Sequence, residues 1–137
     1  IRLGYMVSNE DNMSVLTKTR LAHESNSLRN AVGEYLLDHY DMVDEYVQKV
    51  IKARTHVKDQ LTSLGINSNG EVGNYLLVDL VNTAKRDRIV ASLEENLIYV
   101  KGNFKAPWDK YMLITLGPIE TMERFLNVMK DALEKFA

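Results

Sequence analysis

One stripe of apolar residues constrains this 137-residue sequence more than any other feature. It runs from Leu28 to Leu64, almost forty residues, with the 3.6-residue spacing of a helix. This spacing predicts a long amphipathic helix that packs one face on a core, broken near residues 38–41 where polar residues cluster. Gly65 follows the stripe directly and predicts a left-handed helix end.

The segments around this helix predict an alternation of strands and further helices. Asn9 and its neighbours resemble a helix N-cap, and Pro118 is typical of a helix start. We predict strands at 1–7, 74–79, 97–101 and 111–116, a turn at 67–70, a helix after Asn9, and helices at 83–96 and from 118 to the end. The fold class is therefore α/β or α+β, with the long helix as its spine.

The composition excludes several classes of function. The chain has no cysteine, so it has neither disulfides nor a thiolate nucleophile, and no cysteine-based metal site. The net charge of −2 shows no basic excess for nucleic acid or anionic lipid. No apolar run approaches the roughly 20 residues that span a bilayer. A reducing, cytoplasmic compartment fits a chain without cysteine, and we expect neither nucleic acid nor membrane as partner.

The individual polar residues leave the chemistry open. His23, His39 and His56 are spread along the chain without a carboxylate at a metal-ligand spacing, so we expect ordinary helix histidines and no metal site. The charged run 85–88 fits a solvated helix face or an anion site equally well. Arg2, inside an apolar run, predicts either an ion pair with a neighbouring strand or a contact to an anionic cofactor.

A resemblance to a known family emerges from the order of several motifs. These are an Arg-x-Gly at Arg2 and Gly4, the long helix ending at Leu64-Gly65, and the segments 74–78, 97–101 and 112–120. Together they resemble the C-terminal part of fold-type-I, pyridoxal-phosphate-dependent aminotransferases, in the histidinol-phosphate aminotransferase branch, over essentially the whole chain. The resemblance implies that residues 1–25 are the tail of the large cofactor-binding domain and residues 26–137 the small C-terminal domain.

The resemblance also implies roles for residues near the cofactor. In the family the arginine of the Arg-x-Gly grips the phosphate of pyridoxal 5'-phosphate, and Arg2 matches it. The lysine that forms the Schiff base belongs to a Ser-Lys motif shortly before that arginine, hence upstream of Ile1. We therefore expect a piece of a longer enzyme, with no catalytic residue in this chain and no activity alone.

On the substrate side, the resemblance points to Lys101 and Asn74 as binding residues. The family usually grips a substrate carboxylate with an arginine at the position of Leu113, so this sequence departs from the pattern. Three explanations compete: the substrate lacks that carboxylate; Lys101, Lys105 or Lys110 supplies the charge; or the apolar run around Leu113 is simply core. Asn74 also fits a strand-start residue that bonds its own backbone.

The function that this resemblance implies is amino-group transfer. The full-length enzyme would be a homodimeric transferase acting on a small amine or amino acid, phosphorylated or not, and a keto acceptor. A decarboxylase of the same fold is one alternative. The other is a non-enzymatic α+β ligand-binding or regulatory module, in which the long helix pair serves dimerisation and Arg2 forms an ordinary ion pair.

Overall fold

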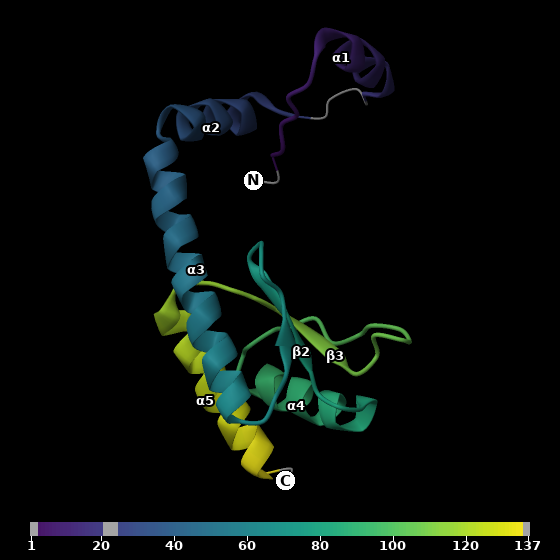
Figure 1. Ribbon diagram of the computed structural model, residues 1–137, viewed down its shortest axis with the longest axis vertical. Coiled ribbons are helices and arrows are strands. Elements are labelled where there is room, and N and C mark those ends of the chain that lie inside the picture. The colour runs from purple at the N-terminus through teal and green to yellow at the C-terminus, as the bar shows by residue number, and fades with distance from the viewer. Residues whose placement is uncertain (1–2, 21–24, 136–137) are drawn as a thin grey trace. The chain divides into compact units, whose positions relative to one another are not determined.

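The computed structural model describes residues 3–20 and 25–135 (Figure 1). The chain forms two compact units, Ile1–Glu45 and Tyr46–Ala137, whose boundary falls inside the long helix α3 (Tyr40–Ser63). The division near residue 25 that the family resemblance implies concerns a larger protein and stays a prediction.

The first unit is built from short helices with asparagine caps. It holds α1 (Glu10–Leu16), the 3-10 helix η1 (Thr17–Thr19), α2 (Ser27–Asp38) and the start of α3. The side-chain oxygens of Asn9 and Asn26 each accept a backbone N–H hydrogen bond at 2.9 Å, at the beginning of α1 and α2. Each cap satisfies one of the donors that a first helical turn leaves unpaired.

The strand predicted at 1–7 is wrong over its described part. Residues 3–7 have no strand pairing, and Tyr5 is 72% exposed. A strand needs a neighbour for its backbone N–H and C=O groups, and a sequence rich in β-forming residues does not supply one. The first two residues, Arg2 among them, lie outside the described part of the chain.

The long helix and its break confirm the prediction from apolar periodicity. α2 ends at Asp38 and α3 begins at Tyr40, with His39 between them at φ −121° and ψ 53°, outside the helical region. α3 ends at Ser63, and Gly65 adopts the predicted left-handed conformation at φ +71°. The N–H groups of Gly65 and Ile66 then donate to carbonyls in the last turn, at 2.9 Å each.

The second unit contains an antiparallel sheet in the order β1 (Ser68–Asn69), β2 (Tyr75–Asp79), β3 (Tyr111–Thr115). The strands predicted at 74–79 and 111–116 are confirmed to within one residue. The turn predicted at 67–70 contains the two residues of β1. The strand predicted at 97–101 is wrong, because only Lys101 pairs, with Leu113, in an isolated bridge.

Helices cover one face of this sheet (Figure 1). The later turns of α3, together with α4 (Thr83–Glu95) and α5 (Ile119–Lys135), contribute to one apolar core with alternate residues of β2 and β3. Burying each such side chain stabilises the fold by roughly 1.5 to 3 kcal/mol. Central core residues are Val57, Leu61, Leu76, Val78, Ile89, Leu93, Met112, Ile114, Leu126 and Met129. The opposite sheet face carries the intervening residues of β2 and β3, which are exposed or half-buried.

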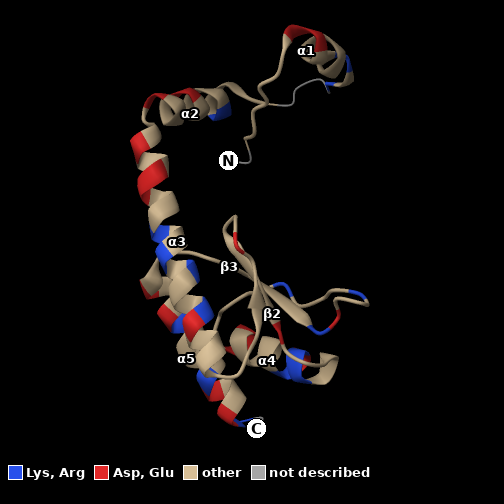
Figure 2. Cartoon of the chain, viewed as in Figure 1, with Lys and Arg blue, Asp and Glu red and all other residues tan. Residues whose placement is uncertain are grey.

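Charged side chains of both signs alternate along the helices. Figure 2 shows acidic and basic residues mixed along α3 and α5.

In the described part of the chain, no helix combines the length and the apolar character that crossing a membrane requires.

Candidate functional site

The structure places Lys101 directly against Leu113, the position at which the family resemblance leads us to expect an arginine. The Lys101 N–H donates to the Leu113 carbonyl at 3.1 Å, and the Leu113 N–H donates to the Lys101 carbonyl at 2.8 Å. Leu113 is also paired with Leu77, and Leu77 with Asn69. Since directly paired residues share a sheet face, Asn69, Leu77, Leu113 and Lys101 form one cross-strand row.

This row lies on the sheet face opposite the core. Met112 and Ile114, on either side of Leu113, are at most 3% exposed, whereas Leu113 itself is half-buried. The alternation follows from the two-residue period of a strand. Leu113 is therefore not a member of the buried core, contrary to the explanation that made the whole apolar run core.

Lys101 offers a cation at the end of the row. The residue is exposed, and its ammonium nitrogen lies 4.9 Å from the centroid of the Phe104 ring, a cation–π distance. In residues 3–20 and 25–135, no carboxylate forms an ion pair with Lys101. The charge of Lys101 is thus not neutralised by a described acidic neighbour.

Lys110, a second candidate for an anion contact, is already paired. Its Nζ donates to Asp79 Oδ2 at 2.6 Å. Burial would raise the pKa of Asp79, but the hydrogen bonds from Lys110 and from the Val81 N–H outweigh burial and lower that pKa. The same hydrogen bond with Asp79 raises the pKa of Lys110. Both pKa shifts favour the charged forms of Asp79 and Lys110. Lys110 therefore stabilises the structure where β2 ends and β3 begins.

Asn74 lies on the other side of β3 from Lys101. Its carbonyl accepts the Leu116 N–H at 2.7 Å, just before β2 begins. The residue lines a groove of about 520 Å³ between the loop 71–74 and α3, whose apolar wall includes Tyr46 and Val47. Arg54 crosses this groove and donates to the Gly73 carbonyl. The structure thus brings Lys101 and Asn74 to one strand without bringing them together.

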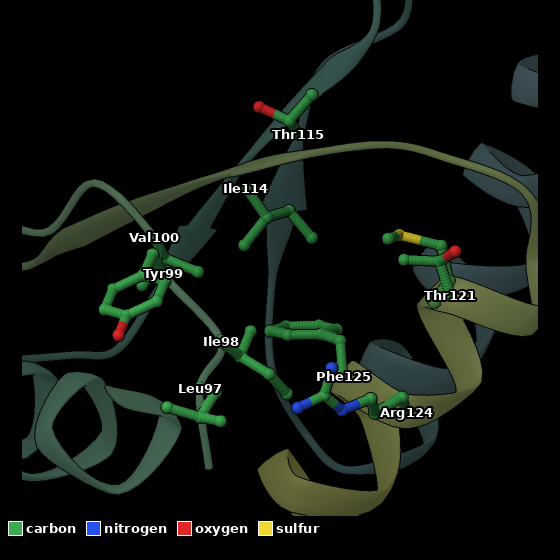
Figure 3. A pocket seen from close by; sticks show the side chains of 10 residues that line it. Leu97, Ile98, Tyr99, Val100, Ile114, Thr115, Thr121, Arg124 and Phe125 are labelled. Carbon is green, nitrogen blue, oxygen red and sulfur yellow. The ribbon is translucent and has the colours of Figure 1, made fainter. Parts of the chain in front are cut away.

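A separate small pocket of about 210 Å³ lies between the segment 97–100, the end of β3 and the start of α5 (Figure 3). Phe125 lies between Ile98 and Ile114 in this view. Arg124, which also lines the pocket, donates to the Asn96 carbonyl at 2.6 Å. The lining is mainly apolar and holds no acid–base pair, so it offers no catalytic chemistry of its own.

Arg86 is a buried charged residue that the sequence analysis did not predict. It is 7% exposed, although the run 85–88 fitted a solvated face. The signal was present, because Arg86 lies three and seven residues before Ile89 and Leu93, on the buried stripe of α4. Its guanidinium donates to Asp87 and to the carbonyl of Gly102.

Of the two described histidines, His56 lies within α3 and His39 lies at the break between α2 and α3. His56 pairs with Glu123 between α3 and α5, and the ring of His39 stacks on that of Tyr35 at 4.0 Å. His23 lies outside the described residues. Across the described ranges, His, Asp and Glu side chains form no cluster of three that could hold a metal ion.

Comparison with known proteins finds relatives of one kind by sequence. No family model matches the chain. Histidinol-phosphate aminotransferase 1 of Burkholderia lata is 32% identical over 136 residues, and the histidinol-phosphate aminotransferase of Lactococcus lactis is 27% identical over 138 residues. These matches cover 97% and 98% of this chain. The chain spans 37% and 38% of those relatives, in their C-terminal part.

Solved structures show the same fold. The histidinol-phosphate aminotransferase of Sinorhizobium meliloti, solved in complex with pyridoxal-5'-phosphate, superposes with a TM-score of 0.80 at 17% identity, over 93% of this chain and 35% of that one. A putative aminotransferase from Burkholderia pseudomallei gives a TM-score of 0.73 at 22% identity, over 88% of this chain and 37% of that one.

In sequence and fold, the chain is homologous to the C-terminal part of pyridoxal-phosphate-dependent aminotransferases. Within that class, its relatives are the histidinol-phosphate aminotransferases. The expected resemblance and fold are thereby confirmed. The roles predicted for Arg2, Lys101 and Asn74 stay predictions.

Proposed function

We propose that this chain is the C-terminal part of a pyridoxal-phosphate-dependent enzyme that transfers an amino group between a small amine or amino acid and a keto acceptor. The observation that carries the proposal is the match over 97% of the chain to one region of histidinol-phosphate aminotransferases. The fold shared with aminotransferase structures supports it. We expect the full-length enzyme to be a cytoplasmic homodimer, as the family resemblance implies.

The cofactor, when bound, supplies an electron sink and carries the amino group. Arg2 would hold its phosphate, and Arg2 lies outside the described residues. The Schiff-base lysine precedes the Arg-x-Gly motif in the family, so we expect the chain alone to be inactive. The described residues supply the substrate side, where we assign binding roles to Lys101 and Asn74.

The charges on the sheet favour Lys101 as the residue that binds an anionic substrate group. Lys110 is neutralised by Asp79, whereas no described acid neutralises Lys101. Leu113 and Leu77 place apolar surface beside the Lys101 cation. We therefore propose a substrate with one anionic group next to an apolar portion at this face, phosphorylated or carboxylated.

The test uses the full-length protein that contains this chain. We expect bound pyridoxal phosphate, visible by its absorbance, and transamination of a keto acid by an amine panel. Lys101→Met should raise KM for anionic amino donors about tenfold, the loss of one contact worth about 1.4 kcal/mol, while Lys52→Met, an exposed-lysine control on α3, leaves KM unchanged.

Other outcomes separate the alternatives. A full-length protein without bound pyridoxal phosphate would refute the enzyme proposal and favour the ligand-binding or regulatory module. Release of carbon dioxide without a transaminated product would identify the decarboxylase instead.

A further inference from the structure

The backbone at Lys101 and Gly102 is hydrogen-bonded to two different elements. One is β3, through the paired hydrogen bonds with Leu113. The other is α4, whose Arg86 side chain donates to the carbonyl of Gly102, the next residue along the chain. Within residues 99–104, the Leu113 pairing joins the backbone to the sheet and the Arg86 contact joins it to α4.

The backbone at Gly102 fits closely against α4. A Cβ atom at this position would lie 2.7 Å from Val90 Cγ2 and 3.3 Å from Arg86 Cδ. Arg86 and Val90 are four residues apart and therefore share one face of α4. The two side chains form a seat that only a glycine backbone can approach this closely.

Burying the Arg86 guanidinium in this contact has a cost in free energy. Arg86 is 7% exposed, and desolvating a charge is costly unless it is paired and hydrogen-bonded. Asp87 Oδ1 accepts from Arg86 Nε at 2.8 Å and lies 2.7 Å from its Nη2, which orients the group toward Gly102. Asp87 is itself 64% exposed, so the pair is buried on the arginine side alone, and the guanidinium depends on the Gly102 carbonyl for its remaining hydrogen bond.

We propose that Arg86 is a positioning residue, which acts through Gly102 to hold Lys101 where it binds the anionic group of the substrate. The proposal rests on the substrate role of Lys101 in the proposed function. The side-chain hydrogen bonds of Arg86 within the described residues go to Asp87 and Gly102 and to no residue of the cross-strand row. It anchors the loop that carries both Lys101 and Phe104, the ring beneath the Lys101 ammonium.

The position of Lys101 can be tested on the 137-residue chain without any assumption about activity. The ring of Phe104 should shift the Lys101 Hε resonances upfield in the wild type. Arg86→Met removes the donor to Gly102 and should abolish at least half of that shift. Arg88→Met, two residues along α4 and exposed, removes the same charge and should preserve the shift.

Binding is then measured by titration with inorganic phosphate, followed at the Lys101 resonances. We expect Arg86→Met to raise the apparent Kd about fivefold relative to Arg88→Met. Arg86→Lys, which keeps the charge and one donor, should restore part of the affinity. The comparison with Arg88→Met separates lost positioning from lost net charge.

A second variant covers the case in which Arg86→Met fails to fold. Gly102→Ala leaves Arg86 intact but forces the loop away from Val90, so it should weaken phosphate binding similarly. Adding Val90→Ala removes the obstructing Cγ2 and should restore binding. If neither Arg86→Met nor Gly102→Ala changed the Lys101 resonances or the Kd, the proposal would be overturned.

The remaining outcomes distinguish the two hypotheses. Equal effects of Arg86→Met and Arg88→Met on the resonances and on the Kd would overturn the positioning role. If phosphate caused no shift of the Lys101 resonances, the substrate role of Lys101 would be overturned. The same would follow if the shifts that phosphate causes at other residues were unchanged in Lys101→Met. The Hε shifts would still decide whether Arg86 positions this side chain.

Discussion

Leu97 offers a sharp test of the backbone geometry, because it is a leucine in the left-handed region. Its φ is +57°, directly after α4, where the Leu97 and Ile98 N–H groups donate to carbonyls in the last turn at 2.9 Å each. Glycine normally occupies this position at a helix end. A Cβ atom there costs roughly 1 to 2 kcal/mol.

The informative comparison is between two variants, Leu97→Ala and Leu97→Gly. Leu97 is 68% exposed, so either substitution loses only about a third of a leucine's burial, on the order of 0.5 to 1 kcal/mol. The glycine variant lacks the Cβ strain that the alanine variant keeps, while its unfolded chain gains freedom worth roughly 0.5 to 1 kcal/mol. We expect Leu97→Gly to be more stable than Leu97→Ala by roughly 0.5 to 1 kcal/mol.

Ala91 provides the matched control within the same helix. It is exposed in the middle of α4, so Ala91→Gly should destabilise by roughly 0.5 to 1 kcal/mol. The unfolded-state contribution is the same at both positions. The difference between the two alanine-to-glycine effects, roughly 1 to 2 kcal/mol, therefore isolates the cost of the Cβ atom at positive φ.

The assay is equilibrium unfolding in urea, followed by fluorescence of the single tryptophan. Trp108 belongs to the second unit, which also contains Leu97 and Ala91; because it is 53% exposed, the loss of helix circular dichroism is followed alongside it. If Leu97→Ala were as stable as Leu97→Gly, or more stable, the left-handed assignment of Leu97 would be refuted.

Three further predictions use the same unfolding assay. Gly65→Ala should destabilise by roughly 0.5 to 1 kcal/mol through backbone strain alone, since no atom lies within 4 Å of where its Cβ would stand; unchanged stability would contradict the left-handed assignment. Leu126→Ala should cost about 2 to 5 kcal/mol because Leu126 is fully buried, and a cost below about 1 kcal/mol would contradict its place in the core. Asp79 has a lowered pKa in the folded state, so its stabilising contribution is complete above its unfolded-state pKa near 4 and is lost as the pH falls below that value. Asp79→Asn should flatten this acid-side loss, and a pH dependence identical to that of the wild type would contradict the pairing with Lys110.

Local patterns in the sequence were sufficient to predict most elements. The apolar spacing from Leu28 to Leu64 and the glycine that follows determined a helix, its break and its end. Periodicity and capping depend on residues within one or two turns, so they are visible without knowledge of the fold. The order of motifs also indicated the aminotransferase family.

Predictions that needed a distant partner fared worse. Both apolar runs at 1–7 and 97–101 have β-forming composition, yet neither forms a strand in the described residues. A strand exists only where another backbone accepts and donates its hydrogen bonds. For the second run, β3 supplies this at Lys101 alone, and the rest of the segment follows the end of α4.

The candidate site likewise has features that the sequence predicts and features that depend on distant contacts. From the sequence by itself, the resemblance predicts that Leu113 stands where the family pattern has a cation, and that Lys101 is a basic residue nearby in the motif order; both stay predictions. Only the tertiary structure decided that these two residues are paired, that Leu113 faces away from the core, and that Arg86 is buried beneath Gly102. Register and burial arise from contacts between segments far apart in the chain, and those contacts form only when the helices pack on the sheet.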